Sequence, residues 1–415
     1  MNSDSRPVAI DPAGRDIHGE GARLRERGPA TLVDLPGQVP AWAVSDPTLL
    51  RELLADPRVS KDPRQHWAAW ANGEITAEWP LFTWVAVSNM FTAYGGEHRR
   101  LRKLVSGAFT ARRTEALRPR IQQIATELLD GLAALPPGET VDLREEYCYP
   151  IPIQVICELF GVSDPDTRRE LRRLVDGVFN TAATPEEAAA TFQQIHTVLS
   201  DLVALKQRSP GDDMTSGLIA VQEEDGSRLS PEELVDTLIL MISAGHETTV
   251  NLLDNAVHAM LTHRDQLALV TSGKAGWNDV IEETLRAEAP VANLPLRYAV
   301  EDIEAHGVRI PKGDAILAAY AAAGRSPAVH GADADRFDIT RELKEHVAFG
   351  HGAHFCLGAP LARLEAEIAL PALFTRFPDL ALAVPADELL PVESFISNGH
   401  RSLPVHLGAH HGATG

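Results

Sequence analysis

The longest uninterrupted helical pattern in this chain lies between Ser230 and Thr262. Apolar residues recur there every three or four positions, and the segment opens with a serine, a proline and Glu233, as a capping box does. Because no helix breaker follows until about Thr262, the pattern predicts a helix of roughly 30 residues, about 45 Å long. A helix of this length crosses a whole domain, so the rest of the chain must pack around it.

The middle of this expected helix contains the sequence AGHETT. Gly245 costs about 1 kcal/mol there relative to alanine, which indicates that another group packs against the helix backbone. Thr248 and Thr249 are poor helix formers, and a threonine hydroxyl can hydrogen-bond to the preceding turn and distort it. Helix N-capping accounts for the same residue types, so the motif by itself is weak evidence of a site.

Other segments are mostly helical as well. Apolar residues follow helical spacing over residues 120–135 and 191–206. Strand-like alternation is clearest over residues 295–320, with expected turns at His306–Gly307 and Lys312–Gly313. Helices therefore dominate, and the few strands come from distant parts of the chain.

No repeat, linker or low-complexity tract divides the 415 residues. We therefore expect one large domain over residues 16–408, mainly α with small β-sheets. The ends, residues 1–15 and 409–415, are expected to be loosely ordered.

Composition narrows the classes of protein to consider. A net charge of −20 argues against nonspecific nucleic-acid binding. No apolar stretch approaches the ~20 residues that span a bilayer, and the N-terminus lacks the apolar core of a signal peptide. Three cysteines are too few and odd in number for a disulfide framework, which indicates a reducing compartment. We expect a monomeric cytoplasmic protein that does not bind membranes, with Cys148 and Cys157 in its core.

One cysteine lies in a different setting. The sequence FGHGAHFCLG places Cys356 in a loop that leads directly into the helical pattern APLARLEAEIAL. A helix N-terminus favours a thiolate, which can act as a nucleophile or as the axial ligand of an iron. Gly350, Gly352 and Gly358 would let the backbone approach a flat, bulky group closely. A third reading joins His351, His354 and Cys356 in a zinc or nucleophilic site of a hydrolase, although no fourth zinc ligand is obvious.

Two further charge patterns stand out. Glu283 and Arg286 in EETLR are three apart on one helical face, and a surface pair of this kind contributes only a few tenths of a kcal/mol. The segment from His98 to Arg120 contains eight Lys or Arg residues and a single acid, Glu115. This basic segment is either a solvated helix face or a docking surface for an acidic partner.

Four motifs of this chain resemble those of the cytochrome P450 family, and they occur in the same order along the sequence. In chain order they are HRRLR, AGHETT, EETLR and FGHGAHFCLG. The family's cysteine loop reads F-G-x-G-x-H/R-x-C-x-G, its distal helix carries A/G-G-x-D/E-T, and E-x-x-R lies between them, as in this chain. The segment HRRLR matches the family's haem-contacting helix. The resemblance covers roughly residues 90–370, and it is strongest to the soluble actinobacterial enzymes that hydroxylate macrolides, steroids and similar molecules.

The resemblance implies a P450 fold, with haem b between the long distal helix and the helix that follows the cysteine. Cys356 would be the axial iron ligand, Glu247 and Thr248 would be catalytic in proton delivery, and Glu283, Arg286 and Arg336 would form a structural lock. The remaining haem contacts would come from His98, Arg102, Ala244, Gly245, Arg297, Phe349, Gly350, His354 and Gly358. Substrate contacts are expected from Trp84, Met90, Phe91, Phe179, Asn180, Ile239, Leu240, Ser243, Val291, Ala292, Leu294, Ile396 and Asn398.

The activity implied is insertion of one oxygen atom of O2 into a C–H bond of a hydrophobic macrolide, steroid or terpenoid-like molecule. Electrons would come from NAD(P)H through a ferredoxin reductase and a ferredoxin, and the basic segment would dock the ferredoxin. Oxidative C–C coupling of an aromatic or cyclic-dipeptide substrate is the alternative activity. A haem-thiolate sensor or carrier without turnover is the non-enzymatic alternative, against which the intact Glu247–Thr248 pair argues.

Overall fold

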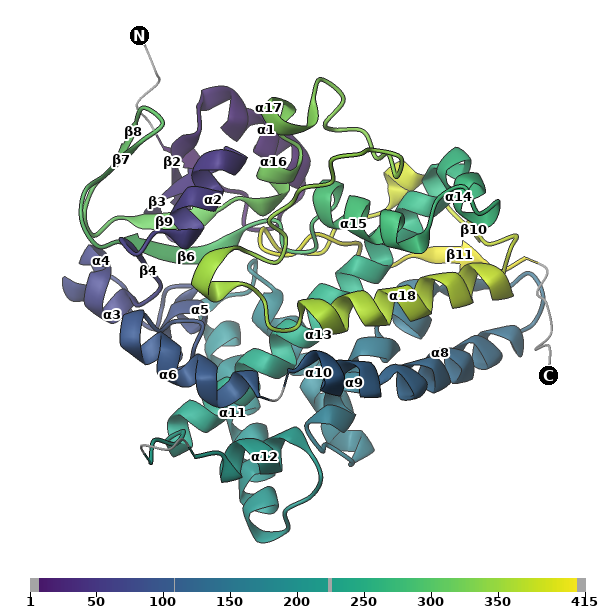
Figure 1. The fold of residues 1–415 in the computed structure, drawn as a ribbon, viewed down its shortest axis with the longest axis horizontal. Helices are drawn as coiled ribbons and strands as arrows, with labels where there is room; N and C mark the ends of the chain where they lie inside the picture. The colour runs from purple at the N-terminus through teal and green to yellow at the C-terminus, as the bar shows by residue number, and fades with distance from the viewer. Residues whose placement is uncertain (1–6, 108, 223–225, 409–415) are drawn as a thin grey trace.

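A computed structural model describes residues 7–107, 109–222 and 226–408 (Figure 1). The helices are α1 (Ile17–Arg27), α2 (Pro47–Ala55), α3 (Pro63–His66), α4 (Ala68–Ala71), α5 (Phe82–Ala86), α6 (Gly95–Ser106), α7 (Ala111–Ala116), α8 (Arg118–Ala133), α9 (Pro150–Leu159), α10 (Pro165–Phe179), α11 (Pro185–Arg208), α12 (Met214–Ala220), α13 (Pro231–Thr262), α14 (Arg264–Thr271), α15 (Trp277–Ala287), α16 (Tyr320–Gly324), α17 (Pro327–His330) and α18 (Ala359–Arg376). The strands are β1 (Val8–Ala9), β2 (Ala30–Leu35), β3 (Val39–Val44), β4 (Val59–Ser60), β5 (Thr140–Asp142), β6 (Leu294–Ala299), β7 (Ile303–Ala305), β8 (Val308–Ile310), β9 (Ala315–Ala318), β10 (Ala381–Leu382) and β11 (Pro404–His406).

The larger sheet lies on one side of the molecule with α1 and α2 against it, whereas the long helices α8, α13 and α18 extend across the other side (Figure 1). The six-stranded sheet has the order β1-β2-β3-β9-β6-β4, and a small sheet joins β10, β11 and β5 from distant parts of the chain. The expected turn at His306–Gly307 connects β7 to β8, and both of its residues have positive φ. This arrangement confirms a mainly α fold with small sheets.

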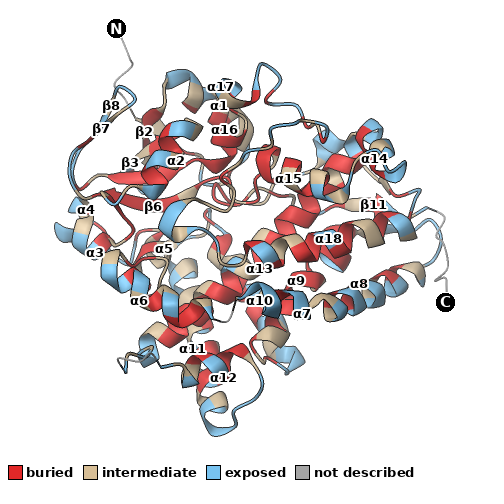
Figure 2. Ribbon diagram, viewed as in Figure 1, coloured by how far each residue is buried: buried red, intermediate tan, exposed pale blue. Residues whose placement is uncertain are grey.

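The long helix α13 forms as its sequence predicts. Its capping box is complete, since Ser230 Oγ accepts from the Glu233 N–H and the Glu233 carboxylate accepts from the Ser230 N–H. Helices α9, α10, α11, α15 and α18 pack around it, and Figure 2 shows much of α13 buried. A Cβ added to Gly245 would lie 2.7 Å from Ile156 Cδ1 of α9, so another group does pack against the backbone there.

The apolar core is interrupted halfway along α13. One cluster of buried residues includes its first half up to Ile242, and a second cluster resumes at Val250. The segment between them contains the AGHETT sequence, so the chain's unusual helix motif lies where the core opens.

The structure also bears on the chain ends and on the two cysteines expected in the core. Residues 1–6 and 409–415 lie outside the described part, whereas Val8–Ala9 pair with β2 at the sheet edge. Cys148 and Cys157 are fully buried, as expected. Among the described residues, no helix has both the length and the apolar character required to cross a bilayer.

Candidate active site

A cavity between α13 and α18 is the place where the predicted site residues meet. Cys356 is exposed toward it from the loop before α18, and Thr248 faces it from α13. Predicted residues that line this cavity are Trp84, Met90, Phe91, Arg102, Phe179, Ile239, Leu240, Ser243, Ala244, Gly245, Val291, Leu294, Arg297, Phe349, Gly350, His354, Gly358 and Ile396. Segments more than 200 residues apart in sequence therefore form one largely apolar chamber.

The cysteine loop is held in shape by glycine conformations and by the neighbouring helix. Gly350 and Gly352 have φ of 73° and 69°, which side-chain-bearing residues rarely adopt. A Cβ at Gly352 would lie 2.7 Å from the Leu54 carbonyl oxygen of α2. The Cys356 N–H donates to the Phe349 carbonyl oxygen at 2.9 Å, which folds the loop back on itself.

Opposing effects act on the Cys356 thiol. Although the side chain is open to the cavity, the thiol lies deep inside the protein, and desolvation raises its pKa. The backbone N–H groups of Gly358 and Ala359 at the start of α18 lower it, followed by the positive charges of Arg102 and Arg363. Burial dominates, so the thiol alone stays protonated at neutral pH. Coordination to a metal ion would remove this proton.

Cationic and aromatic donors gather at one side of the cavity, where Arg102, Arg297 and His354 line it and His98, a predicted haem contact, lies behind His354 and not on the cavity wall. The His98 and His354 rings lie 4.0 Å apart between centroids, and Arg102 donates to the Phe355 carbonyl oxygen at 2.7 Å. Burial, followed by the charges of Arg102 and Arg297, lowers the pKa of His98 to about 4, so its ring is neutral. His98 Nε2 and Arg297 Nε are buried and have no hydrogen-bond partner among the described residues. These unsatisfied atoms indicate a polar or anionic group on this side of the cavity.

The side chains of Glu247 and Thr248, which are adjacent on α13, point in different directions. Thr248 Oγ1 donates to the Ala244 carbonyl oxygen at 2.6 Å on the cavity side. Glu247 does not line the cavity. Its carboxylate is 5% exposed and accepts from Arg144 Nη2 at 3.2 Å and Asn251 Nδ2 at 3.1 Å, and Tyr149 Oη lies 3.3 Å from it.

A buried polar network extends behind Glu247. Arg144 Nη1 also lies 3.3 Å from Asp254 Oδ2, and Tyr149 donates to Asp176. Burial raises the pKa of Glu247 to about 7, because desolvation outweighs the attraction of Arg144. His246, the neighbour of Glu247 in sequence, is fully buried beside Tyr149.

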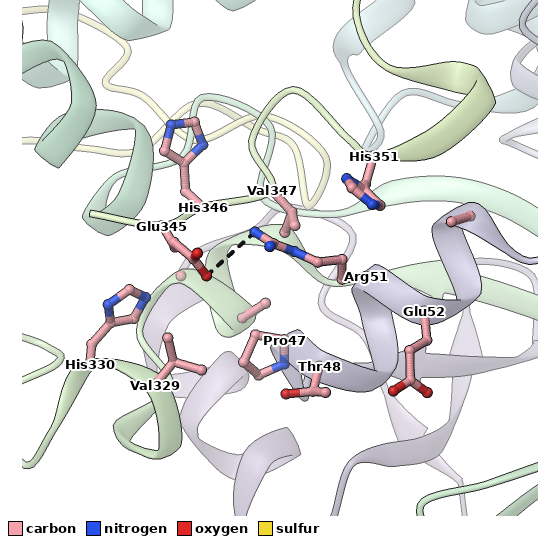
Figure 3. A pocket seen from close by; sticks show the side chains of 13 residues that line it. Pro47, Thr48, Arg51, Glu52, Val329, His330, Glu345, His346, Val347 and His351 are labelled. Atoms are coloured by element: carbon pink, nitrogen blue, oxygen red, sulfur yellow. Dashed lines mark ion pairs between the residues drawn. The ribbon is translucent and has the colours of Figure 1, made fainter. Parts of the chain in front are cut away.

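The structure argues against a zinc site at the cysteine. His354 and Cys356 line the main cavity, whereas His351 lines a separate hollow beside α2 (Figure 3). Figure 3 shows Arg51 and Glu345 of that hollow paired with each other, at 3.6 Å. Within the described part of the chain, the side chains close enough to share one metal ion are Asp176, His246 and Glu247, none of which is in the cysteine loop.

Comparison with known proteins identifies the family. A model of the cytochrome P450 family matches residues 277–383. The 2-hydroxy-5-methyl-1-naphthoate 7-hydroxylase of Streptomyces carzinostaticus is 50% identical over 403 residues, which cover 97% of each chain. The protein belongs to the cytochrome P450 family. It is therefore a haem-dependent monooxygenase, as its motifs predicted.

Solved P450 structures agree with this assignment. CYP154A1 from Streptomyces coelicolor A3(2) shares 58% identity with a TM-score of 0.92, covering 96% of this chain and 100% of that one. CYP154C4 from Streptomyces sp. ATCC 11861, described as testerone-bound, shares 46% identity with a TM-score of 0.94, covering 98% and 100%. The P450 fold thus extends over nearly the whole chain.

The cavity of this P450 fits a haem. Haem carries two carboxylates, and the unsatisfied His98 Nε2 and Arg297 Nε, together with Arg102 and His354, offer donors for them. Cys356 faces the same cavity from the start of α18, where Arg363 lies 4.6 Å from the Phe349 ring. The donor set therefore matches both the iron and the acidic edge of the cofactor.

The Glu283–Arg286 lock of the P450 is formed, but its third member differs from the expectation. Both side chains are fully buried, with two contacts of 2.7 Å between them. Arg336 was predicted as the third side chain, yet it is exposed and supplies only its carbonyl oxygen to Arg286 Nη2 at 2.9 Å. Arg341 approaches instead, with its Nε 3.8 Å from Glu283 Oε1. The segment between α17 and α18 turns after Arg336, and spacing alone could not show this.

Three predicted substrate residues of this P450 are not among those that line the cavity. Asn180 is exposed and caps the end of α10, where its side chain accepts from the Ala182 N–H. Ala292 is fully buried and its N–H donates to Ile396. Asn398 lies at Glu288, to which its side-chain amide donates at 3.3 Å. Each of the three lies one or two positions in sequence from a residue that does line the cavity. The predictions were therefore wrong about the direction of the side chain, not about the segment.

The four tryptophans between Pro63 and Tyr94 divide between core and cavity. Trp67 is buried and stacks on Tyr298 at 5.1 Å between centroids. Trp84 lines the cavity and meets Phe179 edge-on at 5.2 Å. Sequence reasoning missed several other lining residues, among them Lys61, Asn89, Phe109, Ile156 and Thr249. These residues come from different elements, namely the segment after β4, the segments between α5 and α7, and helices α9 and α13, so no shared local pattern selects them.

Proposed function

We propose that this P450 hydroxylates a bulky, flat, largely hydrophobic small molecule, with haem b held by Cys356. The observation that carries the proposal is the placement of Cys356 and Thr248 on one apolar chamber formed by α18 and α13. When bound, the haem would activate O2, so that one oxygen atom enters a C–H bond and the other leaves as water after uptake of two electrons and two protons. The chain's own residues bind, orient and supply protons.

The aromatic wall of the cavity supports a planar, multi-ring substrate. Trp84 contacts Phe91 and Phe179 edge-on, with centroids 6.5 Å and 5.2 Å away. Such faces pack well against fused rings. Two relatives have names consistent with this class, one a naphthoate hydroxylase and one a testerone-bound structure. A product that gains one oxygen atom, traced with 18O2, would support hydroxylation, while loss of two hydrogens with coupled products would favour the alternative coupling reaction.

Proton supply is assigned to the α13 pair. Thr248 presents its hydroxyl to the cavity, where it can hold a water or a proton near bound oxygen. Glu247 lies on the opposite side within the polar network, so it would collect protons there and deliver them by rotating its side chain toward Thr248. A carboxyl whose pKa is near 7 is well suited to exchange protons at neutral pH.

Thr248→Ala is expected to divert reducing equivalents into hydrogen peroxide. Without the hydroxyl, protons reach the distal oxygen less efficiently, so we expect product per NADH to fall about tenfold. Coupling is measured by following NADH, peroxide and product together with a surrogate ferredoxin system. Thr248→Ser, which keeps the hydroxyl, is the matched control and should stay near the wild type. Unchanged coupling in Thr248→Ala would refute the role of this hydroxyl.

The coupling of the wild type is expected to fall as pH rises through about 7. Glu247 carries its proton below its raised pKa of about 7 and loses it above, so fewer donors remain at pH 8 than at pH 6. Arg144, Tyr149 and Asp176 face this carboxyl, and the buried Asp176 carboxylate adds to the rise in its pKa. Product per NADH, measured from pH 6 to 8, should show this midpoint, and Glu247→Gln should give a flat, low profile. A Glu247→Gln profile that matches the wild type would assign the midpoint to another group.

The basic segment supports docking of a ferredoxin. Several of its residues are already paired, such as Arg118 with Glu115 and Arg120 with Glu158. Arg112 and Arg113 of α7 are exposed and form no ion pair with a described residue. Two such cations would attract an acidic electron carrier, with NAD(P)H and a ferredoxin reductase upstream. The monomeric state and the cytoplasmic location also stay predictions.

A further inference from the structure

Lys61 is a buried basic residue on the wall of the cavity that contains Cys356. It follows β4, its residue exposure is 2%, and it lines the same chamber as Cys356. Its Nζ lies 3.4 Å from the centroid of the Phe91 ring and 3.4 Å from the Pro295 carbonyl oxygen. The ammonium group is therefore placed against the face of a ring that belongs to the aromatic wall.

No described carboxylate forms an ion pair with Lys61. The adjacent Asp62 is occupied as the N-cap of α3, where it accepts from the N–H groups of Arg64 and Gln65. Burial, followed by the like charge of Arg297, lowers the pKa of Lys61 well below its usual range. Placing a positive charge on this amine beside a single weak acceptor is therefore costly, and an anion bound beside it would favour the charged form.

The haem carboxylates do not account for this group. Arg102 and Arg297 supply two positive charges for the two carboxylates, and the neutral rings of His98 and His354 add donors. Lys61 is then a further basic group with no carboxylate partner among the described residues. Lys61 is close enough to Arg297 and His354 to interact with them electrostatically, and it differs from them because its Nζ also lies over the Phe91 ring in the aromatic wall.

We propose that Lys61 binds a carboxylate of the substrate, and that Phe91 and Trp84 pack against the ring system that carries this carboxylate. The substrate class is then a planar aromatic carboxylic acid. This inference rests on the proposed function and narrows its substrate. It predicts a preference for an anionic ligand over a neutral ligand of the same shape.

The test compares 1-naphthoate with 1-naphthamide, which has the same rings and no charge. Dissociation constants are measured by equilibrium dialysis and by the Soret shift of the ferric holoenzyme. In Lys61→Met, we expect 1-naphthoate to bind at least about tenfold more weakly, while the affinity for 1-naphthamide stays within about twofold. Arg64→Met is the matched control, because Arg64 is a nearby exposed cation that does not line the cavity. It should change neither constant.

The outcomes separate this inference from the proposed function. Equal affinity changes for both ligands, or no change for 1-naphthoate, would overturn the assignment of Lys61. Loss of haem in Lys61→Met would also overturn it, since the lysine would then belong to the haem carboxylates. A wild type without a haem-thiolate spectrum would overturn the proposed function, whereas the dialysis comparison would still decide the role of Lys61.

Discussion

Replacing Cys356 by alanine is expected to abolish the red-shifted Soret band of the reduced carbon monoxide complex, and hydroxylation with it. The band requires a thiolate bound to iron, and Cys356 is the cysteine that faces the cavity. Cys148 and Cys157 are fully buried elsewhere and cannot replace it without unfolding. The measurement is the reduced-plus-CO difference spectrum, with bound haem quantified separately.

Haem retention makes this experiment interpretable. The donors His98, Arg102, Arg297 and His354 stay in place in Cys356→Ala, so part of the haem should remain bound without its sulfur ligand. Cys157→Ala is the matched control, because it removes a thiol from the core and should keep the red-shifted band. A red-shifted band in haem-loaded Cys356→Ala would refute the assignment of the ligand.

Glu283→Gln is expected to lower the free energy of unfolding by about 3–5 kcal/mol. The substitution leaves the fully buried Arg286 guanidinium without a counter-charge. Arg286 also donates to the carbonyl oxygens of Gly324 and Ala334 at 2.8 and 2.7 Å, so the loss extends to the segment that leads into the cysteine loop. Thermal unfolding followed by circular dichroism and by the Soret band should show a lower midpoint and a lower haem content.

Arg336 and Arg341 provide the contrast for this prediction. Arg336→Ala should change the unfolding free energy by less than about 0.5 kcal/mol, since its side chain is exposed and its carbonyl oxygen is retained. Arg341→Ala should be more damaging, because its guanidinium donates to the carbonyl oxygens of His330 and Asp333 and approaches Glu283. Equal stability of Arg341→Ala and wild type, with a destabilised Arg336→Ala, would restore the original assignment.

The spacing of residues predicted the local structure well where the repeat of apolar positions is enough to define a helix. The capping box at Ser230 and the long apolar repeat were enough to place α13, because helix caps and helical faces depend on residues a few positions apart. The same reasoning failed for Asn180 and Asn398. Each lies next to cavity residues in sequence, but the local backbone turns its side chain toward a helix end or toward Glu288.

The sequence by itself determined the family, the fold class and the cysteine that faces the cavity, because these follow from motifs whose residues are close together. Only the tertiary structure decided which groups are buried and which of them are paired. Glu247 is part of a polar network on the side of α13 away from the cavity. Lys61 is a buried basic residue over Phe91, and its contacts come from residues 30 and 234 positions away in sequence. The burial of Lys61 and its lack of a carboxylate partner arise only when the chain is packed. The proposal of an anionic substrate rests on these two properties, and no local sequence pattern shows them.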